Sequence, residues 1–100
     1  MSGARHKVAQ VGELADGELM AVVAAGTPLV LVRLGSRYSA LDERCPHAGG
    51  PLSQGTIDNG VLVCPWHGRE YDLATGQCAG FQAVATYPVE VDGDGIYVVA

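Results

Sequence analysis

The sequence predicts an all-β fold, a small antiparallel sandwich or barrel. Short runs rich in Val, Leu, Ile and Tyr alternate with turn signals along the 100 residues. The turn signals are Asp16-Gly17, Gly26-Thr27, Gly35-Ser36, Asn59-Gly60, Thr75-Gly76 and the stretch 92–95. Helical periodicity could be argued only for residues 11–25. Gly12 and Gly17 interrupt it there, each at about 1 kcal/mol relative to Ala, so we expect strand, turn and strand.

Each expected strand is delimited by one of these turn signals. The first four strands are separated in turn by Asp16-Gly17, Gly26-Thr27 and Gly35-Ser36, and they cover residues 7–11, 18–24, 29–34 and 38–41. The fifth follows Asn59, the sixth precedes Thr75-Gly76, and the last two flank the stretch 92–95; they cover residues 60–63, 70–72, 87–91 and 96–99.

Composition and length predict a single folded domain over residues 1–100. Hydrophobic residues make up 48% of the chain and charged residues 17%, whereas a disordered chain has the opposite balance. A chain of 100 residues builds one modest core and is too short for a second.

Charge and cysteine count exclude several classes of partner. The net charge of -5 repels a phosphate backbone and an anionic membrane surface alike, so we expect no nucleic acid and no membrane partner. No stretch approaches the roughly 18 apolar residues that span a bilayer, which predicts a cytoplasmic location. Three cysteines are a poor disulfide framework, and two of them lie close to histidines, which points to metal binding.

Two loops carry these Cys and His side chains. They hold Cys45-Pro46-His47 and Cys64-Pro65-Trp66-His67, with sixteen residues between His47 and Cys64. Between them, Asn59-Gly60 suits a two-residue hairpin turn, which requires positive φ. Such a hairpin would let the two loops meet in space.

The four residues allow two other interpretations. A zinc-stabilised interaction module is one, but zinc knuckles usually place paired ligands two to four residues apart, and Cys45-Pro46-His47 is tighter. A chance grouping of buried thiols and surface imidazoles is another. The third cysteine, Cys78, has no nearby His and is expected to be a small apolar core residue.

The two loops resemble those of the Rieske iron-sulfur proteins, in which two histidines replace two cysteines on one iron of a [2Fe-2S] centre. The likeness is the pattern Cys-x-His, sixteen residues, Cys-x-x-His, continued through Gly68, Tyr71-Asp72 and Thr75-Gly76, so that it covers about 44–77. It implies the family's antiparallel β fold, with both cluster-binding loops at one end. It also implies one [2Fe-2S] cluster, with the inner iron on Cys45 and Cys64 and the outer on His47 and His67.

The resemblance further implies a reduction potential at the lower end of the Rieske range. Two ferric ions, two sulfides and two thiolates sum to zero charge, so reduction adds one negative charge to a neutral centre. High-potential members carry a disulfide between positions that are Gly50 and Trp66 here, and a serine donor where this chain has Arg69. Tyr71, whose hydroxyl could donate to a cysteine sulfur, is retained.

The implied function is that of an electron carrier and not an enzyme. The chain is similar to the small ferredoxins of aromatic hydrocarbon catabolism. They take single electrons from a flavin-containing NAD(P)H ferredoxin reductase and deliver them to a terminal Rieske non-haem iron oxygenase. The alternative is a small electron-transfer subunit of a larger reductase, such as a nitrite-reductase-like enzyme. An oxygenase centre needs two further histidines and a carboxylate, and beyond His47 and His67 only His6 remains.

Overall fold

The computed structural model of the chain describes residues 4–44, 50–66, 68–78, 80 and 82–100. These ranges contain β-strands and one short 3-10 turn, η1, and no α-helix, which confirms the expected all-β class. The elements in order are β1 Arg5–Gln10, β2 Leu19–Ala24, β3 Thr27–Leu34, β4 Arg37–Asp42, η1 Leu52–Gln54, β5 Thr56–Asp58, β6 Val61–Val63, β7 Glu70–Asp72, β8 Thr86–Tyr87, β9 Val89–Asp92 and β10 Gly95–Val99.

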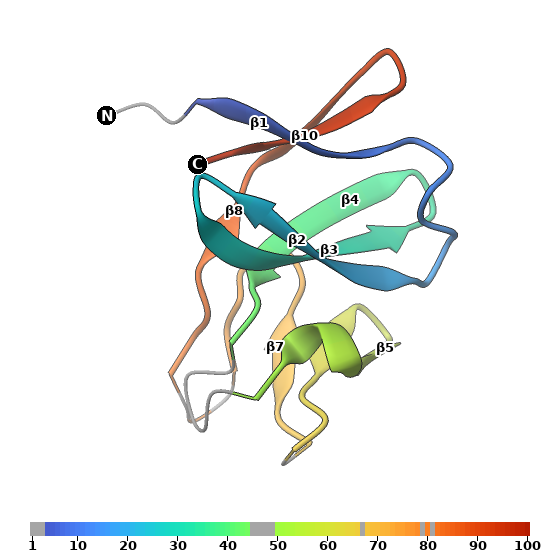
Figure 1. Cartoon of the computed structure of the whole chain (residues 1–100). Helices are drawn as coiled ribbons and strands as arrows, with labels where there is room; N and C mark the ends of the chain where they lie inside the picture. The colour runs from blue at the N-terminus through green and yellow to red at the C-terminus, as the bar shows by residue number, and fades with distance from the viewer. Residues whose placement is uncertain (1–3, 45–49, 67, 79, 81) are drawn as a thin grey trace.

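The strands form three antiparallel sheets, with strand orders β1-β10-β9, β2-β3-β4-β8 and β5-β6-β7. Figure 1 shows them as layers, with β1 and β10 at the top, β2 to β4 in the middle, and β5, β7 and η1 below. The third sheet carries the second candidate loop at one end of the molecule.

The middle sheet is covered on both faces because side chains of β3 alternate between two cores. Leu29 and Leu31 belong to a core that includes Ile96 of β10. Val30 and Val32 belong to a second core, which contains Leu62, Cys64, Tyr71, Leu73 and Cys78. The four β3 residues are at most 1% exposed. Apolar burial of this kind stabilises the fold by about 25 cal/mol per Å². Here it holds the sheet β5-β6-β7 against the sheet β2-β3-β4-β8.

Most of the expected strands are confirmed to within two residues at either end. The segment before Leu19 is turn and bend, which confirms strand, turn and strand in that region. One expected strand, 87–91, is wrong as a single element, because the chain there forms β8 and β9 with Pro88 between them. Proline has no N–H to donate to a ladder, and the carbonyl of Pro88 instead accepts the Val99 N–H at 2.9 Å. The expected strands also omitted η1 and β5.

The predicted hairpin turn at Asn59-Gly60 is confirmed. Asn59 has φ 50° and Gly60 has φ 81°, as a type I′ turn requires. Asp58 pairs with Val61 across the turn, and the register continues from β5 into β6. The hairpin therefore returns the chain from the end of the first loop to the start of the second.

Candidate metal centre

The second candidate loop, residues 64–69, joins β6 to β7 and is closed at its base by two backbone hydrogen bonds. The N–H of Cys64 donates to the Arg69 carbonyl at 2.8 Å, and the N–H of Gly68 donates to the Cys64 carbonyl at 3.0 Å. Gly68 has φ +69°, a conformation that glycine adopts without steric cost. Cys64 is thus fixed where a strand ends and a tight turn begins.

The side chain of Cys64 faces the protein interior. It is 1% exposed and packs in the same core as Leu62 and Tyr71. Its thiol is free of any disulfide. A buried thiol at the end of a rigid strand is a well-positioned metal ligand, because little freedom is lost when it binds.

The first candidate loop is held at both ends. Arg44 forms a β-bridge with Pro51, and the N–H of Leu52 donates to the Glu43 carbonyl at 2.7 Å. The Glu43 carboxylate also accepts the N–H of Ser53 at 2.8 Å. These contacts bring the chain before residue 45 next to the chain after residue 50.

The described parts of the two loops meet at Gly50. A Cβ built on Gly50 would lie 3.1 Å from Cδ2 of Trp66 and 3.3 Å from Sγ of Cys64. A few residues on, Gly55 is packed more tightly still, because a Cβ there would collide with the carbonyl oxygen of Val63. Gly50, at the end of the first loop, therefore packs against the Cys64 sulfur, as expected for two loops joined by a hairpin.

A tight turn follows β7 and fixes its far end. The carboxylate of Asp72 accepts the N–H groups of Ala74 at 2.8 Å and Thr75 at 3.0 Å. These hydrogen bonds, that from Ala74 first, hold the pKa of Asp72 below its ordinary value of 3.8. Gly76 packs against the carbonyl of Val84 and accepts the Val84 N–H at 2.9 Å. The turn over residues 72–76 thus packs the chain that follows β7 against the rest of the fold.

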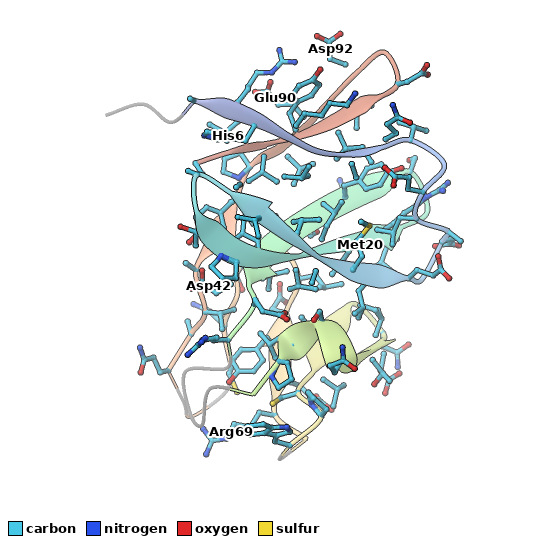
Figure 2. The ribbon with its side chains drawn as sticks, viewed as in Figure 1. His6, Met20, Asp42, Arg69, Glu90 and Asp92 are labelled. Atoms are coloured by element: carbon cyan, nitrogen blue, oxygen red, sulfur yellow. The ribbon has the colours of Figure 1, made fainter. Side chains whose placement is uncertain are left out.

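Charged side chains mark the two ends of the molecule differently. Figure 2 places Arg69 at the loop end and Glu90 and Asp92 at the opposite end. There, Arg5 pairs with Glu90 at 3.5 Å and with Asp92 at 3.2 Å, and it lies 4.2 Å from the centre of the Tyr97 ring. The acidic groups of β9 are therefore remote from the candidate centre and partly neutralised.

Of the four candidate ligands, Cys64 lies within the described residues, whereas Cys45, His47 and His67 lie outside them. Accordingly, no group of three or more His, Cys, Asp or Glu side chains able to hold a metal ion occurs in the described ranges. Cys78 is 7% exposed and packs in the core, which confirms its interpretation as a core residue. The Glu43–Ser53 contact is not predictable from the sequence pattern, in which its one signal is a pair of polar residues flanking the first loop.

The described part of the centre suits an iron-sulfur cluster. The Cys64 sulfur is excluded from water, as a thiolate ligand on an inner iron should be. The space beside it is bounded by a glycine, and any side chain at position 50 would fill the approach to that sulfur. Thiolate and imidazole are the ligands that a Rieske-type centre combines.

Comparison with known proteins agrees with this geometry. The family model described as Rieske [2Fe-2S] domain matches residues 4–91. Ferredoxin CarAc of Metapseudomonas resinovorans is 31% identical over 96 residues, covering 92% of this chain and 90% of the ferredoxin. A chain in the solved complex of reduced oxygenase and oxidized ferredoxin in carbazole 1,9a-dioxygenase is 30% identical. Its TM-score is 0.88, and the match covers 95% of this chain and 92% of that one.

A much longer relative also matches. Apoptosis-inducing factor 3 of Homo sapiens is 30% identical over 94 residues, which are 91% of this chain but 16% of that protein. Further relatives of similar length to this chain are ferredoxin components of dioxygenase systems. Within the described ranges, no helix has the length and apolarity needed to cross a membrane. The chain belongs to the Rieske [2Fe-2S] domain family, whose centre is one [2Fe-2S] cluster.

Proposed function

We propose that this chain is a Rieske ferredoxin, a single-electron carrier whose cluster is held by Cys45, His47, Cys64 and His67. The observation that carries the proposal is the family match across both loops, from residue 4 to residue 91. The packing of Gly50 against the Cys64 sulfur supports it, because this contact draws the two loops to one place. The cluster-binding portion is about 44–77 of a domain spanning 1–100.

The sulfur ligands bind one iron and the nitrogen ligands the other, with Cys45 and Cys64 on the inner iron and His47 and His67 on the outer. The near-complete burial of Cys64 supports an inner position for its sulfur. When bound, the cluster accepts and releases one electron. Two thiolates in place of four leave the oxidised centre neutral, which raises the potential above that of all-cysteine plant-type centres.

The chain's own residues keep the ligands in place during electron transfer. The hydrogen bonds between Cys64, Gly68 and Arg69 close the second loop, and those from Leu52 and Ser53 to Glu43 close the first. Pro65 restricts the backbone next to Cys64. A rigid ligand frame lowers the reorganisation that accompanies a change of charge.

The partners are a flavin-containing NAD(P)H ferredoxin reductase as donor and a terminal Rieske non-haem iron oxygenase as acceptor. Support comes from relatives that match nearly the whole chain and are ferredoxins of dioxygenase systems. The solved complex of a reduced oxygenase with an oxidized ferredoxin supports the acceptor. Docking of redox partners usually buries less than about 1,200 Å², so we expect weak and brief contacts.

The first experiment tests the cluster. Purified protein should contain two irons per chain, in keeping with the [2Fe-2S] centre of the family. Its visible absorption should bleach on reduction, and the reduced form should give an electron paramagnetic resonance signal with an average g below that of the free electron. Substitution of Cys64→Ser should abolish the signal. A colourless, iron-free protein that binds zinc would overturn the proposal.

The second experiment tests the role as carrier. Reduced protein should be reoxidised by a terminal oxygenase only in the presence of its aromatic substrate and oxygen, and oxidised protein should be reduced by NAD(P)H through a flavin reductase. The size of natively isolated material should be that of a free small protein. Stable co-purification with a larger reductase would instead establish the subunit role.

A further inference from the structure

Trp66 is exposed and tightly packed at the same time. Its side chain is 55% exposed, although it lies in the turn between β6 and β7 and next to a buried cysteine. Its ring atoms Cγ and Cδ2 lie against Gly50 of the other loop, where a Cβ would come within 3.2 Å and 3.1 Å of them. One part of the indole thus faces solvent, while another part is held between the loops.

Gly50 is needed for space and not for backbone freedom. Unlike Gly68 or Gly76, it does not have a φ in the left-handed region, so its backbone suits any L residue. The restriction comes from the indole and from the Cys64 sulfur, which a Cβ would approach to 3.3 Å. Position 50 is therefore small because the Trp66 ring occupies the space a side chain would take.

The same contact shields Cys64. The Cys64 residue is 1% exposed, although it is the first residue of a surface turn. A Cβ on Gly50 would touch both the Trp66 ring and the Cys64 sulfur. The ring, the glycine and the sulfur therefore pack together at one place. The indole and the first-loop backbone cover the sulfur on this side.

We propose that Trp66, packed on Gly50, is a positioning residue that fastens the first cluster loop to the second and keeps water from the Cys64 sulfur. The inference rests on the proposed ligand role of Cys64. We call the Trp66–Gly50 contact the latch. It is a non-covalent contact, and the described cysteines, Cys64 and Cys78, form no disulfide. Its strength comes from aromatic area buried across the two loops.

Removal of the ring has two consequences. The first loop loses its contact with the second, so the cluster is released faster. Water also reaches the Cys64 sulfur, and polar surroundings stabilise the extra negative charge of the reduced centre, so the potential rises. A merely structural surface residue would change neither the rate of release nor the potential.

The test compares holoproteins of Trp66→Ala, Trp66→Phe and a control, Val23→Ala. Val23 is 63% exposed on β2, in the four-stranded sheet, so its truncation also removes exposed apolar surface. After iron content is measured, each oxidised protein is incubated with a ferric chelator, and the loss of visible absorption is timed. We expect release about tenfold faster for Trp66→Ala, the lower range for residues supporting metal ligands. Phe should restore most of the difference, and Val23→Ala should behave as wild type.

A second measurement uses the Gly50→Ala variant. Trp66 is the single tryptophan of the chain, so emission of the holoprotein excited at a wavelength that the four tyrosines do not absorb reports on this ring alone. The added methyl group must displace the indole, and we expect a red-shifted emission together with faster cluster release. In the Trp66→Ala background, Gly50→Ala should have a smaller effect on release, because the ring is no longer present. Fully additive effects in this double-mutant cycle would overturn the latch.

The outcomes separate this inference from the proposed function. Wild-type protein without iron would refute the proposed function itself. Wild-type protein with a full cluster, and a Trp66→Ala variant with unchanged release rate and potential, would refute the latch alone. A Trp66→Ala chain that folds, by its urea transition, and yet retains no iron supports the latch. Should that variant not fold, the fluorescence and release rate of Gly50→Ala decide the question.

Discussion

Ser53 donates two hydrogen bonds to the carboxylate of Glu43, one from its backbone N–H at 2.8 Å and one from its hydroxyl at 2.5 Å. The same glutamate accepts the N–H of Leu52 at its backbone carbonyl. Glu43 precedes the first cluster loop and Ser53 follows it, so these hydrogen bonds join the two chain segments at the base of the loop. The contact is partly buried, where hydrogen bonds to a charged group are stronger than at the surface.

Substitution of Ser53→Ala should therefore destabilise the protein by about 1.5 kcal/mol, since it removes the hydroxyl bond to a charged acceptor but keeps the backbone bond. Glu43→Ala should cost more, because it removes both bonds and leaves the Ser53 donors without their partner. Urea unfolding of the holoproteins measures both effects.

The control is Glu18→Ala. The Glu18 carboxylate accepts the Ala15 N–H at 2.8 Å in an exposed turn, where water replaces the lost bond. We expect this control to cost less than Ser53→Ala. Equal costs for Glu18→Ala and Glu43→Ala would show that the base of the loop contributes no more than an ordinary surface turn.

Features that depend on local sequence were predictable, and those that depend on the tertiary structure were not. The residue types Asn59 and Gly60 predict the turn, because both adopt the positive φ that it requires. The apolar run of β3 predicts a strand that is buried on both faces. The contact of Gly50 with Trp66 requires two loops to be placed in space, which no local pattern specifies. Pro88 is a local signal that the prediction of one strand over 87–91 overlooked, because proline lacks the N–H that a continuous strand would need there. The ligand roles of Cys45, His47 and His67 stay predictions.

Two glycines with the same backbone conformation should respond differently to Ala. Gly76 and Gly80 both have φ +76°, so a side chain is strained at either position, by roughly 1 kcal/mol. A Cβ on Gly76 would in addition collide with the Val84 carbonyl and come within 3.0 Å of Cγ2 of Thr86, whereas a Cβ on Gly80 would meet no atom of the described residues within 4 Å. We expect Gly76→Ala to destabilise by about 3 kcal/mol or more and Gly80→Ala by about 1 kcal/mol. Thermal unfolding of the pair measures the difference, and equal shifts in Tm would contradict the close packing of Gly76.

Asp72 should make stability depend on acidic pH. Its pKa is lowered in the folded protein by the N–H groups of Ala74 and Thr75, so the charged form contributes stability above the unfolded pKa, near 3.8. That contribution is lost as pH falls through the lower, folded value. Asp72→Asn keeps an acceptor oxygen but removes the charge.

The difference in free energy of unfolding between wild type and Asp72→Asn should thus be constant near neutral pH and decline below about pH 4. Urea titrations at a series of pH values provide the measurement. A difference that persists unchanged to the lowest pH at which the protein folds would exclude the charge as its cause.

Tyr87 should have the opposite dependence, at alkaline pH. Its hydroxyl donates to the Asp42 carboxylate at 2.8 Å, and this bond, together with burial, raises the pKa of Tyr87 above 10.0. A raised pKa stabilises the fold below pH 10 and loses this contribution as pH rises through the folded value. Tyr87→Phe should cost about 1 kcal/mol at pH 7, and the cost should shrink above pH 10.

Asp42→Asn serves as the matched variant, because it keeps an acceptor for Tyr87 but removes the charge. Titration of the four tyrosines by ultraviolet absorbance should show one of them ionising at lower pH in this variant. An unchanged tyrosinate titration would mean that the contact with Asp42 does not hold the phenol proton.

Cys78 should prove dispensable for the cluster although it shares a core with Cys64. It is 7% exposed, its thiol is free, and it packs among apolar side chains. Cys78→Ala should keep two irons per chain and the visible spectrum, and should cost about 1 kcal/mol through the small cavity it leaves. Cys78→Ser should cost more, because it buries a hydroxyl in an apolar site. Iron analysis and urea unfolding separate the two quantities, and loss of iron from a stably folded Cys78→Ala protein would assign this cysteine to the metal centre in place of the core.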